Sequence, residues 1–128
     1  MASGDYAILV GIWKYGDTST FPPLNGPIND VELIATWLQA ANGGAVPAAN
    51  ITTIISPPVI APQTEVDSYL PATEQFKRAF KKLVCDEEGH FVNRPGRLYL
   101  YFSGHGFCER TSLTAQAALY SANATREF

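Results

Sequence analysis

A histidine between two glycines follows a short apolar run in the last third of the 128-residue sequence. The run covers residues 98–102, and it is followed by Ser103, Gly104, His105 and Gly106. An unbroken apolar run of this length indicates a strand buried on both faces. An imidazole at the end of such a strand can exchange protons near neutral pH, at the sheet edge where open α/β folds bind ligands. The alternative is a loop histidine that is only solvated.

The glycines on either side of His105 have a role of their own in this interpretation. Glycine lets the backbone turn sharply, and it lets a substrate approach the main chain closely. The pattern therefore predicts an accessible imidazole at the end of a strand.

The elements that must position this histidine follow from apolar periodicity. Residues 6–12 are a second continuous apolar run and predict a buried strand, and residues 51–55 predict another strand. Pro27 begins a predicted helix that ends at Gly43 and Gly44, and Thr73 is the expected N-cap of a second helix. Residues 56–71 predict a long exposed loop, and residues 117–120 a short strand. The expected apolar faces of the two helices are Val31, Ile34, Ala35, Leu38 and Ala41, and Phe76, Ala79, Phe80, Leu83 and Val84.

The order strand, helix, strand, helix, strand predicts an α/β fold with a parallel sheet and flanking helices. In a flavodoxin-like order the first and third strands are neighbours, and the second lies outside them. The loop that begins at Trp13, the helix start at Asp30, and His105 are then expected to face one crevice. Three strands leave one edge of the sheet bare, so half of the sheet is expected to lie elsewhere.

Composition excludes several classes of partner. A net charge of −3 argues against nucleic acid and anionic membranes, because both favour a basic surface. No apolar stretch reaches the roughly 18 residues that a membrane span needs, and the first residues do not have the layout of a signal peptide. Two cysteines, Cys85 and Cys108, are too few for a disulfide framework. These features predict a cytoplasmic protein.

The sequence gives little support for a phosphate-binding loop or a receiver-like module at the end of the first predicted strand. Gly11 and Gly16 have the spacing of a phosphate-binding loop, but the Lys-Ser/Thr pair that holds phosphate and magnesium does not follow. A receiver-like module needs clustered acidic residues after the first strand, and Ile12, Trp13 and Lys14 supply none. A flavodoxin- or receiver-like binding module, in which His105 would be incidental, is therefore the least favoured interpretation.

Four segments, in order and over nearly the whole chain, resemble landmarks of the caspase and metacaspase superfamily. They are residues 6–12 (YAILVGI), 24–31 (LNGPINDV), 71–76 (PATEQF) and 100–106 (LYFSGHG). The chain is most similar to the bacterial, metacaspase-like members. The resemblance implies a caspase-like fold and the activity of a cysteine endopeptidase.

By this resemblance His105 is the histidine of a Cys–His dyad. A cysteine thiol is mostly protonated at neutral pH, and a nearby imidazole can remove its proton and later protonate the leaving amine. The backbone N–H of Gly106 would donate to the oxyanion, and the second donor in this family is the amide of the nucleophile itself.

The nucleophile is expected outside this chain. In caspases the histidine precedes the cysteine by roughly 50 residues, which would place the cysteine beyond Phe128. Cys108 lies in the same predicted loop as His105 with no strand of its own to present it, so a small loop residue is the preferred interpretation. Cys85, at a helix end, indicates packing.

Residues 1–128 are therefore interpreted as the N-terminal, large-subunit-like part of a single caspase-like peptidase domain, trimmed or separated by proteolytic processing. The remaining C-terminal part, which carries the catalytic cysteine, is the expected partner, and the chain alone is expected to be inactive. The alternative is a catalytically dead caspase fold kept as an interaction or scaffold module.

The resemblance also implies a substrate preference. In metacaspase-like relatives the positions of Asp30 and Ser103 line the S1 pocket, and a carboxylate there favours a substrate Arg or Lys. Metacaspases often have cysteine where this chain has Pro27, and Asp30 is equally suited to the first turn of a helix. We expect a protein or peptide substrate, limited proteolysis of a partner protein, and no cofactor or metal, with calcium dependence left open. His90 carries no prediction of function.

Overall fold

The computed structural model describes residues 4–15, 19, 21–56, 72–94, 96–108 and 117–119. The long loop predicted for residues 56–71 therefore lies almost wholly outside the described residues. The elements are, in order, β1 (Tyr6–Ile12), α1 (Pro27–Gln39), a 3₁₀ turn (Ala48–Asn50), β2 (Ile51–Ser56), α2 (Ala72–Val84), β3 (Leu98–Ser103), β4 (Gly106–Cys108) and β5 (Ala117–Leu119).

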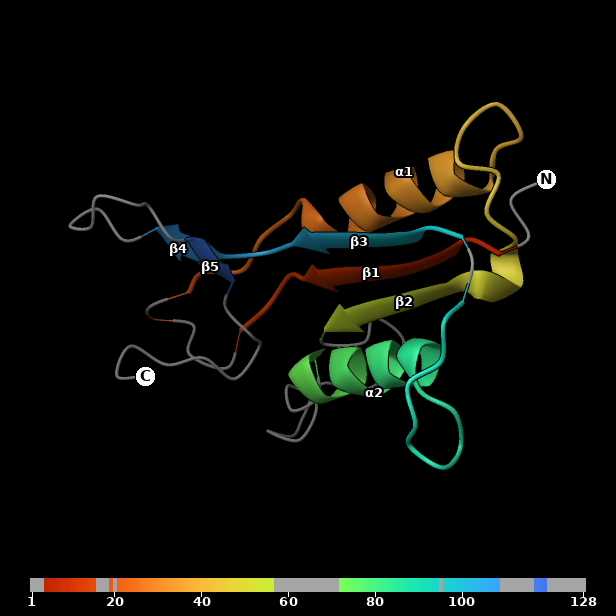
Figure 1. Cartoon of the computed structure of the whole chain (residues 1–128). Helices are drawn as coiled ribbons and strands as arrows, with labels where there is room; N and C mark the ends of the chain where they lie inside the picture. Colours follow the sequence, from red (N-terminus) through yellow and green to blue (C-terminus); the bar gives the residue numbers. More distant parts are fainter. Residues whose placement is uncertain are drawn as a thin grey trace.

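Strand β1 is the centre of a three-stranded parallel sheet in the order β2-β1-β3 (Figure 1). This order confirms the prediction that the first and third strands are neighbours. The register sets Gly11 of β1 beside Ser103 of β3 and Ile12 beside Ser56 of β2. The carboxyl ends of all three strands therefore lie at one end of the sheet, where the chain continues toward His105.

The two helices cover opposite faces of the sheet (Figure 1). On the α1 face, Ala7 and Leu9 pack with Val31 and Leu38 in one buried cluster. On the α2 face, Ile8, Val10 and Ile12 form a second cluster, against which Phe76, Ala79 and Leu83 pack. Because successive side chains of a strand point to opposite faces, β1 contributes to both clusters and is buried on both sides.

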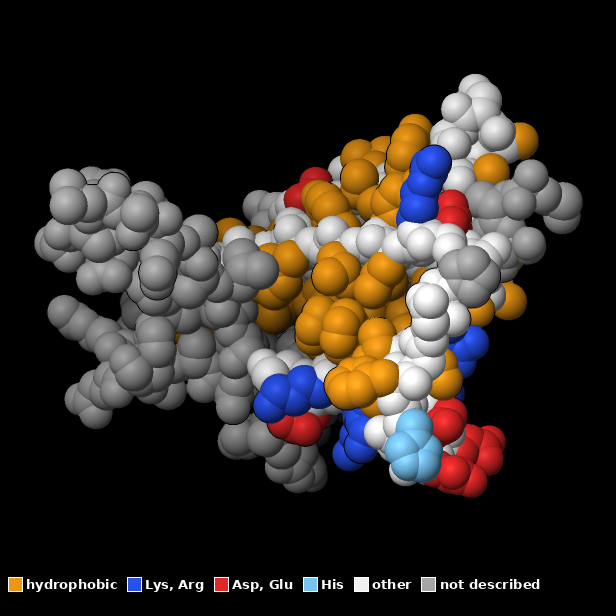
Figure 2. Space-filling model, in the orientation of Figure 1, with side chains coloured by type: hydrophobic (Ala, Val, Ile, Leu, Met, Phe, Trp, Pro, Cys, Tyr) orange, Lys and Arg blue, Asp and Glu red, His pale blue; other side chains and the backbone are white. Residues whose placement is uncertain are grey.

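The prediction that β3 is buried on both faces is wrong. Leu98 is 38% exposed and Leu100 is 55% exposed, whereas Tyr99 and Tyr101 pack into the cluster under α1. The reason is position: β3 is an edge strand, and α2 packs over β1 and β2 but makes no substantial contact with β3. Figure 2 shows hydrophobic side chains gathered below β3 on this side of the molecule.

Several element boundaries also differ from expectation. Helix α2 begins at Ala72, so Thr73 lies inside the helix and does not cap it, and α1 ends at Gln39, before Ala41. Phe80, which was expected on the apolar face of α2, is 38% exposed and stacks on Phe76.

The predicted short strand near the end of the chain is β5. It pairs antiparallel with β4, a strand that periodicity did not predict, in a separate two-stranded sheet. Among the described residues, no helix has both the length and the apolar character needed to cross a membrane.

Gly11, the residue before the last one of β1, shows why a glycine occurs within an apolar strand. A Cβ atom there would lie 2.9 Å from Val31 Cγ2 and 3.0 Å from the Pro27 carbonyl oxygen. The absence of a side chain therefore lets the first turn of α1 pack directly against β1. This glycine serves helix–strand packing and brings Asp30, in the same turn, close to the carboxyl end of the sheet.

Candidate functional site

His105 lies just beyond the carboxyl end of β3, and its imidazole is held through one nitrogen. Nε2 is 3.0 Å from the carbonyl oxygen of Pro22. A carbonyl oxygen only accepts hydrogen bonds, so Nε2 carries the proton in this contact. In the neutral ring, Nδ1 is then an acceptor, and within the described part of the chain it makes no hydrogen bond.

Two aromatic rings flank this imidazole. The ring centroid of Tyr15 lies 5.1 Å from that of His105, and the centroid of Phe21 lies 5.7 Å from it. Tyr15 and Phe21 are buried, and the centroids of their two rings lie 5.2 Å apart. Both come from the segment that follows β1, so the loop beginning at Trp13 does meet His105, as the topology predicted.

The backbone of His105 is held as well. Its N–H donates to the Tyr15 hydroxyl at 2.7 Å, and the side chain of Tyr15 is fully buried. Burial raises the pKa of Tyr15, and the hydrogen bond from the His105 amide lowers it by a smaller amount, so the net shift is upward. The hydroxyl is therefore neutral at physiological pH.

Gly104 is required at this turn for a reason that differs from the expected one. Positive φ angles occur at Gly89 and Gly96 among the described glycines, and Gly104 is not one of them. A Cβ atom on Gly104 would instead lie 2.7 Å from the Tyr15 hydroxyl and 2.9 Å from the Phe102 ring. The glycine therefore makes room for Tyr15.

Asp30 and Ser103, which the resemblance pairs in one pocket, touch directly. Ser103 Oγ donates to Asp30 Oδ2 at 2.8 Å across the gap between β3 and the first turn of α1. Both residues are partly buried. An ionised carboxylate can accept further hydrogen bonds, so Asp30 is able to bind a cationic group as well as the serine hydroxyl.

Comparison with known proteins places this geometry in a family. The family model described as the caspase domain matches residues 5–127. The chain belongs to the caspase family. The match covers all the elements of the structure, and the parallel sheet with flanking helices agrees with it.

A curated bacterial protein is also similar to this caspase-family chain. A probable protease from a Desulfuromonadales bacterium is 29% identical to the chain over 120 residues. The aligned region covers 90% of the chain but only 13% of the relative, so the chain corresponds to a small part of that protein. No solved structure matched the chain.

The remaining predicted site residue, Gly106, is the first residue of β4 and lies opposite Leu119 of β5. Cys108 was expected in a loop, but its backbone lies in β4 opposite Ala117. Cys85 follows α2, is partly buried and has a free thiol. Its backbone pairs with that of Phe91 in an isolated antiparallel β-bridge, away from the carboxyl ends of the strands.

Sequence reasoning did not single out three residues of the described part of the chain that approach the imidazole: Tyr15, Phe21 and Pro22. A signal for the first two was present. Large aromatic residues in a segment otherwise rich in Gly, Asp, Thr, Ser and Pro are poorly suited to solvent, and they indicate that the loop packs on something.

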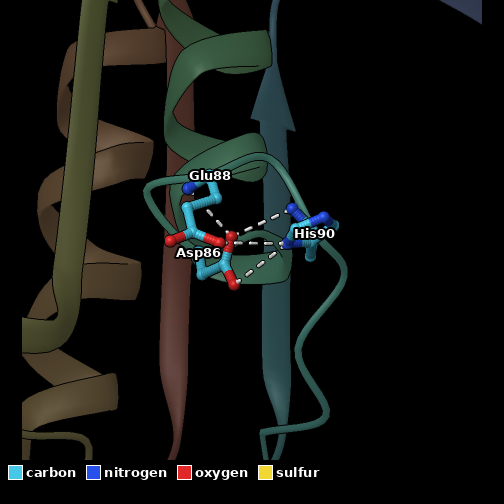
Figure 3. A group of neighbouring side chains, drawn as sticks. All are labelled: Asp86, Glu88 and His90. Atoms are coloured by element: carbon cyan, nitrogen blue, oxygen red, sulfur yellow. Dashed lines mark hydrogen bonds and ion pairs between the residues drawn. The ribbon is translucent and has the colours of Figure 1, made fainter.

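A second group of ionisable side chains lies in the turn after α2 (Figure 3). Asp86, Glu88 and His90 offer potential ligand atoms that all lie within 4.8 Å of one another, and all three residues are exposed. Their arrangement has a local explanation, because Asp86 Oδ1 accepts hydrogen bonds from the backbone N–H groups of Glu88 and His90. The group therefore stabilises a surface turn.

Proposed function

We propose that this chain is the large-subunit-like portion of a caspase-like cysteine endopeptidase, in which His105 is the catalytic base. The observation that carries the proposal is the hydrogen bond between His105 Nε2 and the Pro22 carbonyl oxygen. It selects the tautomer in which Nδ1 has a lone pair, at the sheet edge where ligands of parallel α/β folds bind.

The proposed reaction uses this lone pair. Nδ1 of His105 takes the proton of a cysteine thiol, and the thiolate attacks the carbonyl carbon of the scissile peptide bond. The backbone N–H of Gly106 donates to the oxyanion that forms. The C–N bond then breaks as the imidazolium returns its proton to the leaving amine, and water hydrolyses the resulting thioester to release the acid and the thiol.

The cysteine in this proposal belongs to the remaining C-terminal part of the domain. The outer edge of β3 has no paired strand among the described residues, and Leu98 and Leu100 are exposed beside it. An unpaired edge next to exposed apolar side chains is suited to the addition of another strand. We therefore expect the missing part to dock here, and the isolated chain to be inactive.

A basic residue at the P1 position of the substrate is proposed from the contact between Asp30 and Ser103. Ser103 orients one carboxylate oxygen, and the charge of Asp30 favours a guanidinium or ammonium group over a carboxylate. The substrate is then a protein or peptide cleaved after Arg or Lys, and limited cleavage of a partner protein is the proposed role.

The test compares two histidines in the full-length protein. His105→Gln should lower the cleavage of Arg-terminated fluorogenic peptides by roughly 10²- to 10⁴-fold, the usual contribution of general acid–base catalysis. His90→Gln, in the exposed turn, is the matched control and should leave the rate unchanged. Equal rates for the His105 variant and the parent protein would overturn the proposal.

The alternative, a caspase fold kept as an interaction module, gives a different result. The full-length protein would then cleave neither Arg- nor Asp-terminated peptides, and a cysteine-directed inactivator would label no residue opposite His105. Preference for Asp at P1 would retain the peptidase but contradict the role proposed for Asp30.

A further inference from the structure

We propose that Tyr15 is a positioning residue for His105: its buried hydroxyl anchors the turn that carries the imidazole, and so sets which ring nitrogen can act as the base. The consequence for catalysis rests on the proposed function. The coupling between Tyr15 and the imidazole does not, because it can be measured without any substrate.

The first step of the argument is the backbone contact. The Tyr15 hydroxyl oxygen lies 2.7 Å from the amide nitrogen of His105, and the tyrosine side chain is 0% exposed. The contact is partly buried, and an amide that loses its acceptor in such a setting is destabilised, so this contact favours one position of the residue 105 backbone. Gly104 leaves room for this contact, because a Cβ atom on residue 104 would lie 2.7 Å from the same hydroxyl.

The second step connects the backbone to the ring. The rings of Tyr15 and Phe21 and the carbonyl of Pro22 all approach the imidazole, and all belong to the segment between β1 and α1. The base of this segment is closed by a 2.7 Å hydrogen bond from Leu24 N–H to the Trp13 carbonyl oxygen. The segment therefore holds His105 at two points, the amide and Nε2.

The third step is the effect of removing one of these points. Without the hydroxyl, the amide of His105 has lost its acceptor and the turn can shift relative to Pro22. The contact that keeps the proton on Nε2 then weakens, and the Nδ1-protonated tautomer, which cannot accept the thiol proton at Nδ1, becomes more populated.

The experiment uses Tyr15→Phe in the full-length protein, which keeps the ring and removes only the hydroxyl. The readouts are the tautomer of His105 by nitrogen-15 NMR of the imidazole, assigned by comparison with His105→Gln, and the separate values of kcat and KM. We expect a larger Nδ1–H population and a roughly tenfold lower kcat, the scale of one hydrogen bond, with KM changed less than twofold.

The matched control is Tyr6→Phe, the same change at the other end of β1, where the neighbouring residue on β3 is Leu98. It should leave both the tautomer and kcat unchanged. Should Tyr15→Phe give the parent spectrum of His105, or should Tyr6→Phe shift that spectrum equally, the inference is overturned.

A double-variant cycle tests the same contact when one variant is poorly folded. Gly104→Ala places a methyl group against the hydroxyl, so its effect on the His105 tautomer should shrink when Tyr15 is already Phe. Fully additive effects would contradict the inference. If no variant at His105 alters peptide cleavage, the proposed function fails, while the NMR comparison still decides the role of Tyr15.

Discussion

The two histidines of this chain have opposite surroundings. His90 lies in a surface turn with its side chain 74% exposed, and its Nδ1 is 3.7 Å from Asp86 and 3.5 Å from Glu88. His105 has no carboxylate partner within the described residues, and it contacts two buried aromatic rings, a carbonyl and a hydroxyl.

The difference shows that ligand-type residues close together are weaker evidence for a site than fixed geometry. Exposed ion pairs contribute little, because water competes for both partners and long side chains lose freedom. The hydrogen bond from the His105 amide to the Tyr15 hydroxyl is partly buried and holds one backbone position, because the polar atoms have few alternative partners there. His105 is therefore a better candidate for a functional residue than His90, although it has fewer ionisable neighbours.

The largest expected difference is between substitutions at two glycines, Gly104 before His105 and Gly89 before His90. Gly104→Ala should lower the free energy of unfolding by about 2 kcal/mol through overpacking, and it should also lower kcat strongly, because the methyl group displaces Tyr15 or Phe102. Thermal unfolding and peptide cleavage of the full-length protein measure the two effects.

Gly89→Ala is the control for that variant. Gly89 has φ +85° and nothing within 4 Å of an added Cβ, so the variant should lose about 1 kcal/mol of stability from backbone strain and keep the parent kcat. An equal fall in kcat for both glycine variants would mean that stability alone controls activity.

The next largest effect concerns the two aspartates. Asp30→Asn keeps the hydrogen bond to Ser103 but removes the charge, so kcat/KM for Arg at P1 should fall roughly tenfold relative to a neutral P1 residue. Asp86→Asn, in the turn, should leave this ratio unaltered. An unchanged ratio in the Asp30 variant would rule out its contribution to specificity.

A smaller effect is expected in alkaline solution. The pKa of Tyr15 is raised above its usual 10.0, chiefly by burial, so the folded protein holds this proton more tightly than the unfolded chain. The resulting stability is fully present below pH 10.0 and is lost as pH rises from there through the folded pKa. Urea unfolding between pH 7 and pH 11 should therefore show a steeper alkaline loss for the parent than for Tyr15→Phe, and parallel curves would contradict the burial of this hydroxyl.

The smallest effect is expected at the turn itself. His90→Ala removes only exposed contacts between the imidazole and two carboxylates, so the free energy of unfolding should change by less than about 0.5 kcal/mol, with no change in activity. A large loss of stability would show that the turn after α2 is more important than its exposure indicates. Urea unfolding at neutral pH is sufficient to measure it.

Much of the fold was predictable from sequence because apolar periodicity reports local structure directly. The runs that became β1, β2 and β3 and the two helical patterns were sufficient for the strand order, since right-handed crossovers leave few topologies for this arrangement. That order also brings Asp30, Ser103 and His105 to one end of the sheet before any side-chain contact is known.

Tertiary structure decided what each residue touches. Periodicity marked β3 as apolar but did not show that α2 would leave Leu98 and Leu100 uncovered, because coverage depends on where a distant helix packs. The contact between Tyr15 and His105 joins residues 90 positions apart, through a loop whose path has no periodic pattern. Local pattern therefore determined the elements and their order, while the direction of the imidazole depended on chain segments that meet only when the protein folds.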